Sequence, residues 1–276
     1  MRSRNDKILA HVDLQGCGVE IGPVFNPILP KRAGFKTHVI DHTDREGLCN
    51  KYGPEGHNID LIEEVDFVWR GESYQELTGK SHAYDWVIAS HVIEHMPDLI
   101  GFICDCDSIL KPSGVISLVV PDKRYCFDRF RPISSLGRVI DAHFYRYKRH
   151  SPGSLAEYYL NVVAQNGNII WDHNSVGNFS FIHSLEMARD AMQQAIESSD
   201  YRDAHAWCFT PSSFRLLIHD LFQLGLIPVQ ELDFFPTTGS EFYITLSRSG
   251  TGIPVSRMEL LNRLEVELNG AILLKA

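Results

Sequence analysis

A strand-like run ends in a turn that contains glycine and is preceded by an acid. Residues 18–23 read GVEIGP, with Glu20 just before the turn and Gly22 and Pro23 in it. Glycine allows a ligand to approach the backbone closely and adopts left-handed dihedral angles. A pyrophosphate prefers bare backbone N–H groups at a helix N-terminus, and the carboxylate of Glu20 would repel it. The turn therefore favours a ligand that carries a positive charge.

A second acid follows at the distance typical of a ribose contact. The run THVID, residues 37–41, is expected to be a strand that ends on Asp41. An acid at this place, about twenty residues after the turn, can accept hydrogen bonds from two ribose hydroxyls. Turn and acid together predict a ligand of the adenosine type, and Glu20 favours one with an ammonium or sulfonium group.

Histidines and acids follow the later strands, where a proton acceptor would be needed for a hydroxyl substrate. We consider His95, Asp122, His143 and His205 as candidate catalytic bases. The alternatives are that His95 supports local structure and that Asp122 caps the turn after its strand. His91 is expected to line the cofactor. No metal ligands are assigned, because long-range spacing cannot show whether Asp122, His143 and His205 converge.

The elements that must position these residues follow an α/β pattern. Short β-rich runs alternate with helical ones, which predicts a mostly parallel sheet with helices on its faces. Pro97 and Asp98 fit the first turn of one helix, and Thr210 with Pro211 fit the start of another. The last two strands are joined by PTTGS and are expected to pair antiparallel at the sheet edge. The expected strands span residues 17–21, 37–41, 64–69, 84–90, 114–122, 227–235 and 241–248.

The pattern breaks between residues 123 and 203. We expect this stretch to be an insertion without clean strands that caps the carboxyl ends of the strands, where open α/β sheets bind ligands. It is rich in aromatic residues and is locally basic in an otherwise acidic chain. The basic residues either form a solvated face or bind an anionic acceptor, since Arg matches carboxylate and phosphate groups. They are Lys123, Arg124, Arg129, Arg131, Arg138, Arg146, Lys148 and Arg149.

The chain is expected to be a single domain over residues 1–276 that ends in an amphipathic helix at 255–272. Met258, Leu261, Leu264 and Leu268 share one face of this helix. That face either docks on the body or mediates self-association, which would make a homodimer.

The bulk composition limits the partners. The formal net charge is -9, which makes nucleic acid an unlikely partner because its binding requires phosphate neutralisation. No long apolar stretch suggests a signal peptide or a membrane span. None of the six cysteines forms a C-x-x-C pair, so we expect reduced cysteines and a cytoplasmic protein.

Several motifs in order carry a resemblance to a known family. GVEIGP resembles the G-x-E-x-G motif of class I S-adenosylmethionine-dependent methyltransferases, and VIDH resembles their second motif. EEVDFVW lies where the family contacts adenine. YDWVIASHVIEHMPD resembles the fourth-strand motif, and ILKPSGVISLVVPD resembles the following turn and fifth strand. PDKRYCFD is similar to sequences of type 11-like members that accompany polysaccharide and small-molecule biosynthesis.

The resemblance implies a Rossmann-like sheet of seven strands, mostly parallel, with the last strand inserted antiparallel. It implies S-adenosyl-L-methionine as cofactor and O-methylation of a small polar acceptor, such as a phosphorylated or nucleotide-linked sugar or a glycan. The alternatives are a catalytically inactive scaffold subunit and an N- or C-methyltransferase of a natural product. A nicotinamide-dependent oxidoreductase would need a G-x-G-x-x-G turn, which is absent. The residues that the resemblance assigns to cofactor binding are Glu20, Gly22, Pro23, Asp41, His42, Asp66, Val68, Ser90 and His91.

Two prolines follow the first turn, at positions 27 and 30. Proline stiffens the backbone and opposes a helix. We expect residues 24–30 to delay the first helix and to form a lid over the methionine end of the cofactor.

Overall fold

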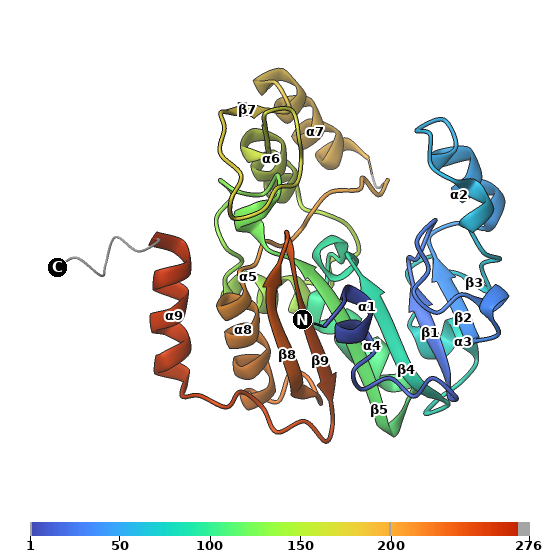
Figure 1. Cartoon of the computed structure of the whole chain (residues 1–276). Coiled ribbons are helices and arrows are strands. Elements are labelled where there is room, and N and C mark those ends of the chain that lie inside the picture. The colour runs from blue at the N-terminus through green and yellow to red at the C-terminus, as the bar shows by residue number, and fades with distance from the viewer. Residues whose placement is uncertain (1, 199, 270–276) are drawn as a thin grey trace.

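Seven strands form one sheet in the order β3-β2-β1-β4-β5-β9-β8 (Figure 1). The computed structural model describes residues 2–198 and 200–269. The first five strands pair in parallel, and β9 is antiparallel to both β5 and β8. This confirms the predicted Rossmann-like sheet. The strands are β1 (Cys17–Ile21), β2 (Lys36–Asp41), β3 (Phe67–Val68), β4 (Tyr84–Ser90), β5 (Leu110–Pro121), β8 (Gln230–Thr238) and β9 (Glu241–Ser247).

Two strands differ from their predicted bounds. β3 is only two residues long, because the side chain of the preceding Asp66 bonds the backbone N–H of Val39 instead of leaving it to the sheet. β5 begins at Leu110, before the expected KPSG turn. The register between Tyr84 and Trp86 shifts at this point, so the turn residues form a β-bulge in the strand.

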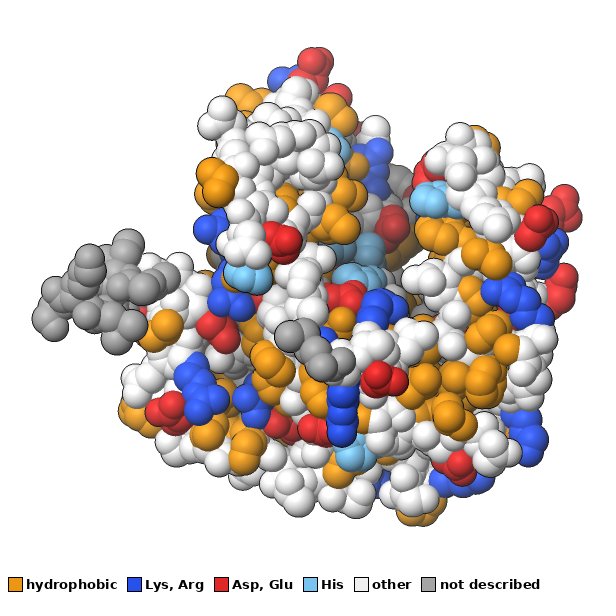
Figure 2. All heavy atoms as spheres, in the orientation of Figure 1, with side chains coloured by type: hydrophobic (Ala, Val, Ile, Leu, Met, Phe, Trp, Pro, Cys, Tyr) orange, Lys and Arg blue, Asp and Glu red, His pale blue; other side chains and the backbone are white. Residues whose placement is uncertain are grey.

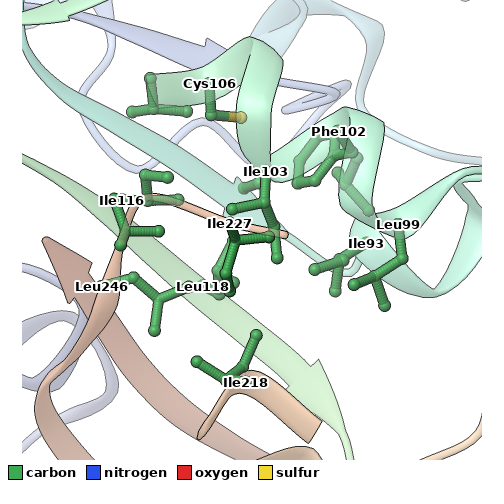
Figure 3. Packing of buried hydrophobic residues seen from close by; sticks show 14 of the residues in the cluster. Ile93, Leu99, Phe102, Ile103, Cys106, Ile116, Leu118, Ile218, Ile227 and Leu246 are labelled. Atoms are coloured by element: carbon green, nitrogen blue, oxygen red, sulfur yellow. The ribbon is translucent and has the colours of Figure 1, made fainter. Parts of the chain in front are cut away.

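One face of the sheet carries the main core. Helices α3 (Tyr74–Thr78), α4 (Leu99–Ile109), α5 (Leu136–Phe144) and α8 (Pro211–Gln223) belong to this side. Figure 3 shows apolar side chains of α4 beside those of β5, β9 and α8. Asp98 is the N-cap of α4, so Pro97 precedes the helix rather than lying in its first turn. Thr210 and Pro211 begin α8 as expected.

The opposite face has a thinner cover. Its core unites Ile8 of α1 (Arg4–Ile8) with Ile28, Leu29 and sheet residues such as Trp86 and Ile88. Between β1 and β2 the only helical element is the 3-10 turn η1 (Lys31–Ala33). The expected first helix is therefore absent between β1 and β2, where bends and turns stand beside the prolines at 27 and 30.

Apart from α5, the chain between β5 and α8 lies above the carboxyl ends of the strands (Figure 1). The expectation of no strands here was wrong, since β6 and β7 pair as a two-stranded antiparallel sheet. Helix α2, after β2, rises beside the same edge (Figure 1). The elements are η4 (Lys123–Tyr125), α6 (Pro152–Asn161), β6 (Val163–Gln165), β7 (Phe179–Phe181), α7 (Leu185–Glu197), α2 (Arg45–Tyr52) and η2 (Ile59–Leu61).

The last helix, α9 (Arg257–Asn269), packs on α8. Its buried residues are Leu260 and Leu264, whereas Met258 and Leu268 are exposed. The predicted face is therefore wrong in part, because the contact with α8 uses a neighbouring stripe. The predicted residues beyond Asn269 lie outside the described part of the chain. Within the described part, no helix combines the length and apolarity needed to cross a membrane.

Candidate cofactor and acceptor site

The glycine turn after β1 has the backbone that the sequence suggested. Gly22 has φ of 61°, and a side-chain Cβ added there would lie 3.2 Å from Val92 Cγ2. Val24 has φ of 47°, a costly conformation for a β-branched residue. Gly18 in β1 faces Trp86 so closely that a Cβ would overlap the indole ring. The first glycine of the motif therefore serves packing, and the second serves the turn.

Glu20 points into the protein and not toward a cofactor cation. It is 2% exposed, and its two carboxylate oxygens accept hydrogen bonds from the backbone N–H groups of Ile28 (2.7 Å) and Leu29 (3.2 Å). Burial raises the pKa of Glu20 to about 7, against the lowering effect of these two bonds. The predicted direct role in cofactor binding is corrected: Glu20 anchors the segment that replaces the first helix. Because Ile28 and Leu29 are buried against the sheet, they cannot be part of a lid.

Asp41 lies at the end of β2 with one oxygen free. Its Oδ1 accepts a hydrogen bond from the backbone N–H of His42 and lies 2.6 Å from His42 Nδ1. Its Oδ2 is buried and has no hydrogen-bond partner among the described residues. A buried carboxylate oxygen without a partner is costly, and a ribose hydroxyl is a donor that would satisfy it.

Val68 and Asp66, the two residues expected to contact adenine, differ in their surroundings. Val68 is in register with Asp41, which puts it at the same edge. The Oδ2 of Asp66 instead accepts hydrogen bonds from the backbone N–H of Val39 (2.7 Å) and from Lys31 Nζ (2.6 Å). This oxygen therefore joins β2 to the segment after β1, and the adenine contact of Asp66 stays a prediction.

Ser90 and His91 end β4 within a network that includes the start of the chain. Arg4 donates to Ser90 Oγ (2.8 Å) and to Glu241. His91 has φ of 55°, and its Nε2 lies 2.7 Å from Glu241. Although burial lowers it, the carboxylates of Glu241 and Glu94 together raise the pKa of His91 to about 9. His91 is therefore a cation near neutral pH and is unsuited to accept a proton.

Glu94, in η3 (Ile93–His95), is completely buried. Neither of its carboxylate oxygens has a hydrogen bond among the described residues. The nearest cation is His91, whose Nδ1 lies 3.4 Å from Oε1. Its backbone carbonyl accepts from the N–H groups of Ala206 and Trp207, which joins η3 to the chain leading into α8.

The structure brings His95 and His205 together. Their ring centroids are 4.6 Å apart with the rings nearly perpendicular. Nδ1 of His95 lies 2.8 Å from Asp203, and Nδ1 of His205 lies 2.5 Å from Asp128. Each carboxylate fixes one ring nitrogen and leaves Nε2 for other chemistry. Although burial lowers it, Asp203 and then Glu94 raise the pKa of His95 above its usual value.

The other two candidate bases lie elsewhere. Asp122 is fully buried, caps η4, and binds both Arg124 and Thr237. Its side chain is therefore occupied in holding the end of β5. His143 is bonded to Asp98 at the N-terminus of α4 and has no contact with His205 among the described residues. The set Asp122, His143 and His205 does not converge.

The surface above this edge is hollowed. Figure 2 shows a deep recess between the part formed by α6 and α7 and the part formed by α2, with histidine side chains on its floor. Aromatic rings surround His205: Phe127 lies 4.6 Å away and Tyr158 6.4 Å away, centroid to centroid. The aromatic residues of the 123–203 segment therefore serve partly as a wall beside the histidines.

Three of the eight basic residues at positions 123–149 pair with acids inside the protein. Arg124 pairs with Asp122, and Arg131, which has no exposed side-chain surface, pairs with Asp128. Arg138 pairs with Glu157. These three residues are therefore held by acids within the protein. The members without an acidic partner in the described chain are Lys123, Arg129, Arg146, Lys148 and Arg149.

Sequence reasoning missed the residues that organise the two histidines. Asp128, Asp203 and Glu94 were not among the predicted site residues. Spacing carried no signal for them, because 77 positions separate His205 from Asp128 and 108 separate His95 from Asp203.

One comparison with known proteins identifies a family. A family model described as a methyltransferase domain matches residues 15–221. No curated protein matches the chain.

Three solved structures are similar to this chain at low identity. A Rhodobacter sphaeroides protein, provisionally described as a zinc-dependent alcohol dehydrogenase, overlaps with a TM-score of 0.44 and 13% identity, covering 89% of this chain and 88% of that one. The CcbJ methyltransferase of Streptomyces caelestis gives 0.43 and 10%, covering 87% and 86%. A SAM-dependent methyltransferase of Thermotoga maritima gives 0.35 and 15%, covering 89% and 88%. Similarity at this level does not distinguish the reaction or the acceptor.

Proposed function

The chain belongs to the methyltransferase-domain family, and from that premise we propose that it methylates a hydroxyl oxygen of a small polar acceptor such as a sugar or glycan. The cofactor is S-adenosylmethionine, which supplies a methyl group already activated on a sulfonium. The task left to the chain is to align the acceptor, exclude water and deal with the hydroxyl proton.

The residues at the sheet edge fit this cofactor. Asp41 offers the buried Oδ2 that lacks a partner, which suits a ribose hydroxyl. Gly22 keeps the turn open, since a Cβ there would approach Val92. Val92 lies two residues before Glu94, so the turn and the histidine cluster are neighbours. We propose that Gly22, Pro23, Asp41, His42 and residues at the end of β4 hold the cofactor.

One observation carries the choice of oxygen as the acceptor atom. His95 and His205 lie together, each with Nδ1 fixed by a carboxylate. A nitrogen nucleophile could react without such groups, whereas a hydroxyl must lose its proton. We propose that these two histidines activate the acceptor hydroxyl, and that Asp128 and Asp203 orient them.

The acceptor's class is a further part of the proposal. The rings of Phe127 and Tyr158 lie beside His205, and aromatic rings stack on sugars. Arg146, Lys148 and Arg149 have no acidic partner among the described residues and border cavities at the segment. Their free charges support an acceptor with a phosphate or carboxylate group.

The test follows transfer of label from methyl-labelled cofactor to a panel of sugar phosphates, nucleotide sugars and a cell extract. We expect His205→Ala to reduce transfer about 100-fold or more while affinity for the demethylated cofactor is unchanged. His143→Ala is the matched control, because His143 is also bonded to a carboxylate but lies outside the cluster.

Equal transfer by the His205 and His143 variants would refute the role of the cluster. Binding of cofactor without transfer to any acceptor would favour a scaffold subunit. Labelled products that carry the methyl group on nitrogen would refute the choice of oxygen.

A further inference from the structure

Three potential ligands converge at the floor of the recess. One ring nitrogen each of His95 and His205 and one carboxylate oxygen of Glu94 lie within 4.8 Å of one another. A tetrahedral Zn²⁺ holds its ligand atoms roughly 3.3 Å apart, given bonds of about 2.0–2.1 Å. The three side chains therefore need to draw together by on the order of 1 Å.

The surroundings of the two imidazoles are those of metal ligands. A ligating histidine usually donates its second ring N–H to a carboxylate, which fixes the tautomer and makes the ligating nitrogen more basic. His95 meets this condition through Asp203, and His205 meets it through Asp128. In both rings the bonded nitrogen is Nδ1, so Nε2 is the nitrogen that remains for a ligand.

Glu94 gives an independent indication. It is 0% exposed, and neither of its oxygens has a hydrogen bond within the described residues. A buried carboxylate in this condition is strongly unfavourable unless a cation meets it. His91 supplies one, but at 3.4 Å and only to Oε1. A second cation is therefore needed to satisfy the group.

Several acids surround the cluster, and some of them already pair with cations. The acids are Glu94, Asp128, Asp203, Glu157 and Glu241, and the cations that touch them are Arg4, Arg131, Arg138 and His91. A dication would be held by attraction as well as by coordination.

We propose that Glu94, His95 and His205 bind a divalent cation of the Zn²⁺ type. Two imidazoles with one carboxylate suit Zn²⁺, Fe²⁺ or Co²⁺ better than Mg²⁺ or Ca²⁺, which prefer oxygen ligands. Three protein ligands leave a position for an oxygen of another molecule. The sequence assigned no metal ligands, and of its three residues with metal potential only His205 belongs to this set.

A bound cation also explains how the two histidines would activate the acceptor hydroxyl, and this point rests on the proposed function. An acceptor hydroxyl bound to the cation has a lowered pKa, so its proton leaves to water in the recess. The methyl carbon–sulfur bond breaks as the methyl carbon–oxygen bond forms. The products are the methyl ether, the demethylated cofactor and one proton.

The experiment titrates Zn²⁺, and separately Co²⁺, into chelator-treated full-length protein without acceptor. Calorimetry measures affinity and stoichiometry, and the visible absorption of bound Co²⁺ reports its ligand geometry. We expect one equivalent to bind. His205→Ala and Glu94→Gln should each weaken binding by more than 100-fold, and Asp203→Asn by about 10–100-fold, as expected for a group that orients a ligand.

His143→Ala is the control, because it removes an imidazole of the same kind that has no third ligand beside it. Binding of the demethylated cofactor verifies that each variant is folded. Absence of a stoichiometric site, or equal losses in the His205 and His143 variants, would overturn the metal site. Methyl transfer by metal-free protein would overturn it as the activator of the hydroxyl and leave the proposed function standing.

Discussion

The substitution Glu20→Gln tests whether the buried carboxyl group of Glu20 stabilises the protein by holding the segment after β1. In the structure the carboxylate accepts two consecutive backbone N–H groups, those of Ile28 and Leu29. Glutamine has the same shape, but its single oxygen can accept only one of them. The loss of one bond to a buried N–H should cost about 1–3 kcal/mol in the free energy of unfolding at pH 5.

The ionisation of Glu20 destabilises the folded protein, in contrast to the hydrogen bonds of its side chain. Burial raises the pKa of Glu20 from 4.5 to about 7, so the folded protein binds more protons than the unfolded chain between these values. Stability therefore falls as pH rises through this window. Between pH 5 and pH 8 the ionisation of Glu20 costs the wild type about 2.5 kcal/mol. Glutamine does not ionise, so the deficit of E20Q should shrink by this amount at pH 8.

The assay is urea denaturation followed by tryptophan fluorescence at both pH values, for the wild type and E20Q. Other titrating groups are common to both proteins and cancel in the difference. Glu63→Gln at pH 5 is the control for the hydrogen bonds alone, because Glu63 also accepts two consecutive backbone N–H groups but is less buried. Parallel pH profiles of the wild type and E20Q would refute the raised pKa.

Three further predictions concern the cofactor edge and the 123–203 segment. Asp41→Asn should weaken binding of the demethylated cofactor about 10–100-fold by calorimetry, because the ribose loses an anionic acceptor, whereas Asp44→Asn should not. Gly22→Ala should cost about 1–2 kcal/mol for its left-handed conformation and also weaken cofactor binding. Gly34→Ala, at φ of 91° with open space around it, should cost stability alone. Arg131→Ala should lower the free energy of unfolding in urea by about 3 kcal/mol, because it removes a buried cation and leaves Asp128 with His205 as its remaining partner.

The sheet was predictable from sequence because short β-rich runs alternate with helical ones, and some of the runs end on a recognisable residue. Asp41 and Ser90 mark two such ends. The short β3 was not predictable, since the competing bond from Asp66 to Val39 comes from a side chain and not from a periodic pattern. The absence of the first helix was predictable only in part. The prolines oppose a helix and can be seen in the sequence. The hydrogen bonds from the segment to Glu20 are tertiary contacts, which the sequence does not reveal.

The candidate site also contains one part that the sequence predicts and one part that it does not. The glycine turn and Asp41 belong to contiguous motifs, and they stay predicted cofactor contacts. The partners of His95 and His205 come from segments far away in sequence, and no spacing rule connects them. Glu20 belongs to a motif that the sequence shows clearly, but its side chain was expected to face the cofactor and instead points into the protein. A strand alternates its side chains between faces, but the sequence does not say what lies opposite each face.

The contact between Arg4 and Glu241 has a consequence for how the chain is made. Arg4 and His91 both bind Glu241, which lies 237 and 150 positions later. At about 5–20 residues per second of ribosomal synthesis, roughly 8–30 s pass between His91 and Glu241. During that time β5 lacks its neighbour β9 and offers an open strand edge. The nascent chain is therefore expected to need protection by a chaperone until its last strand is inserted.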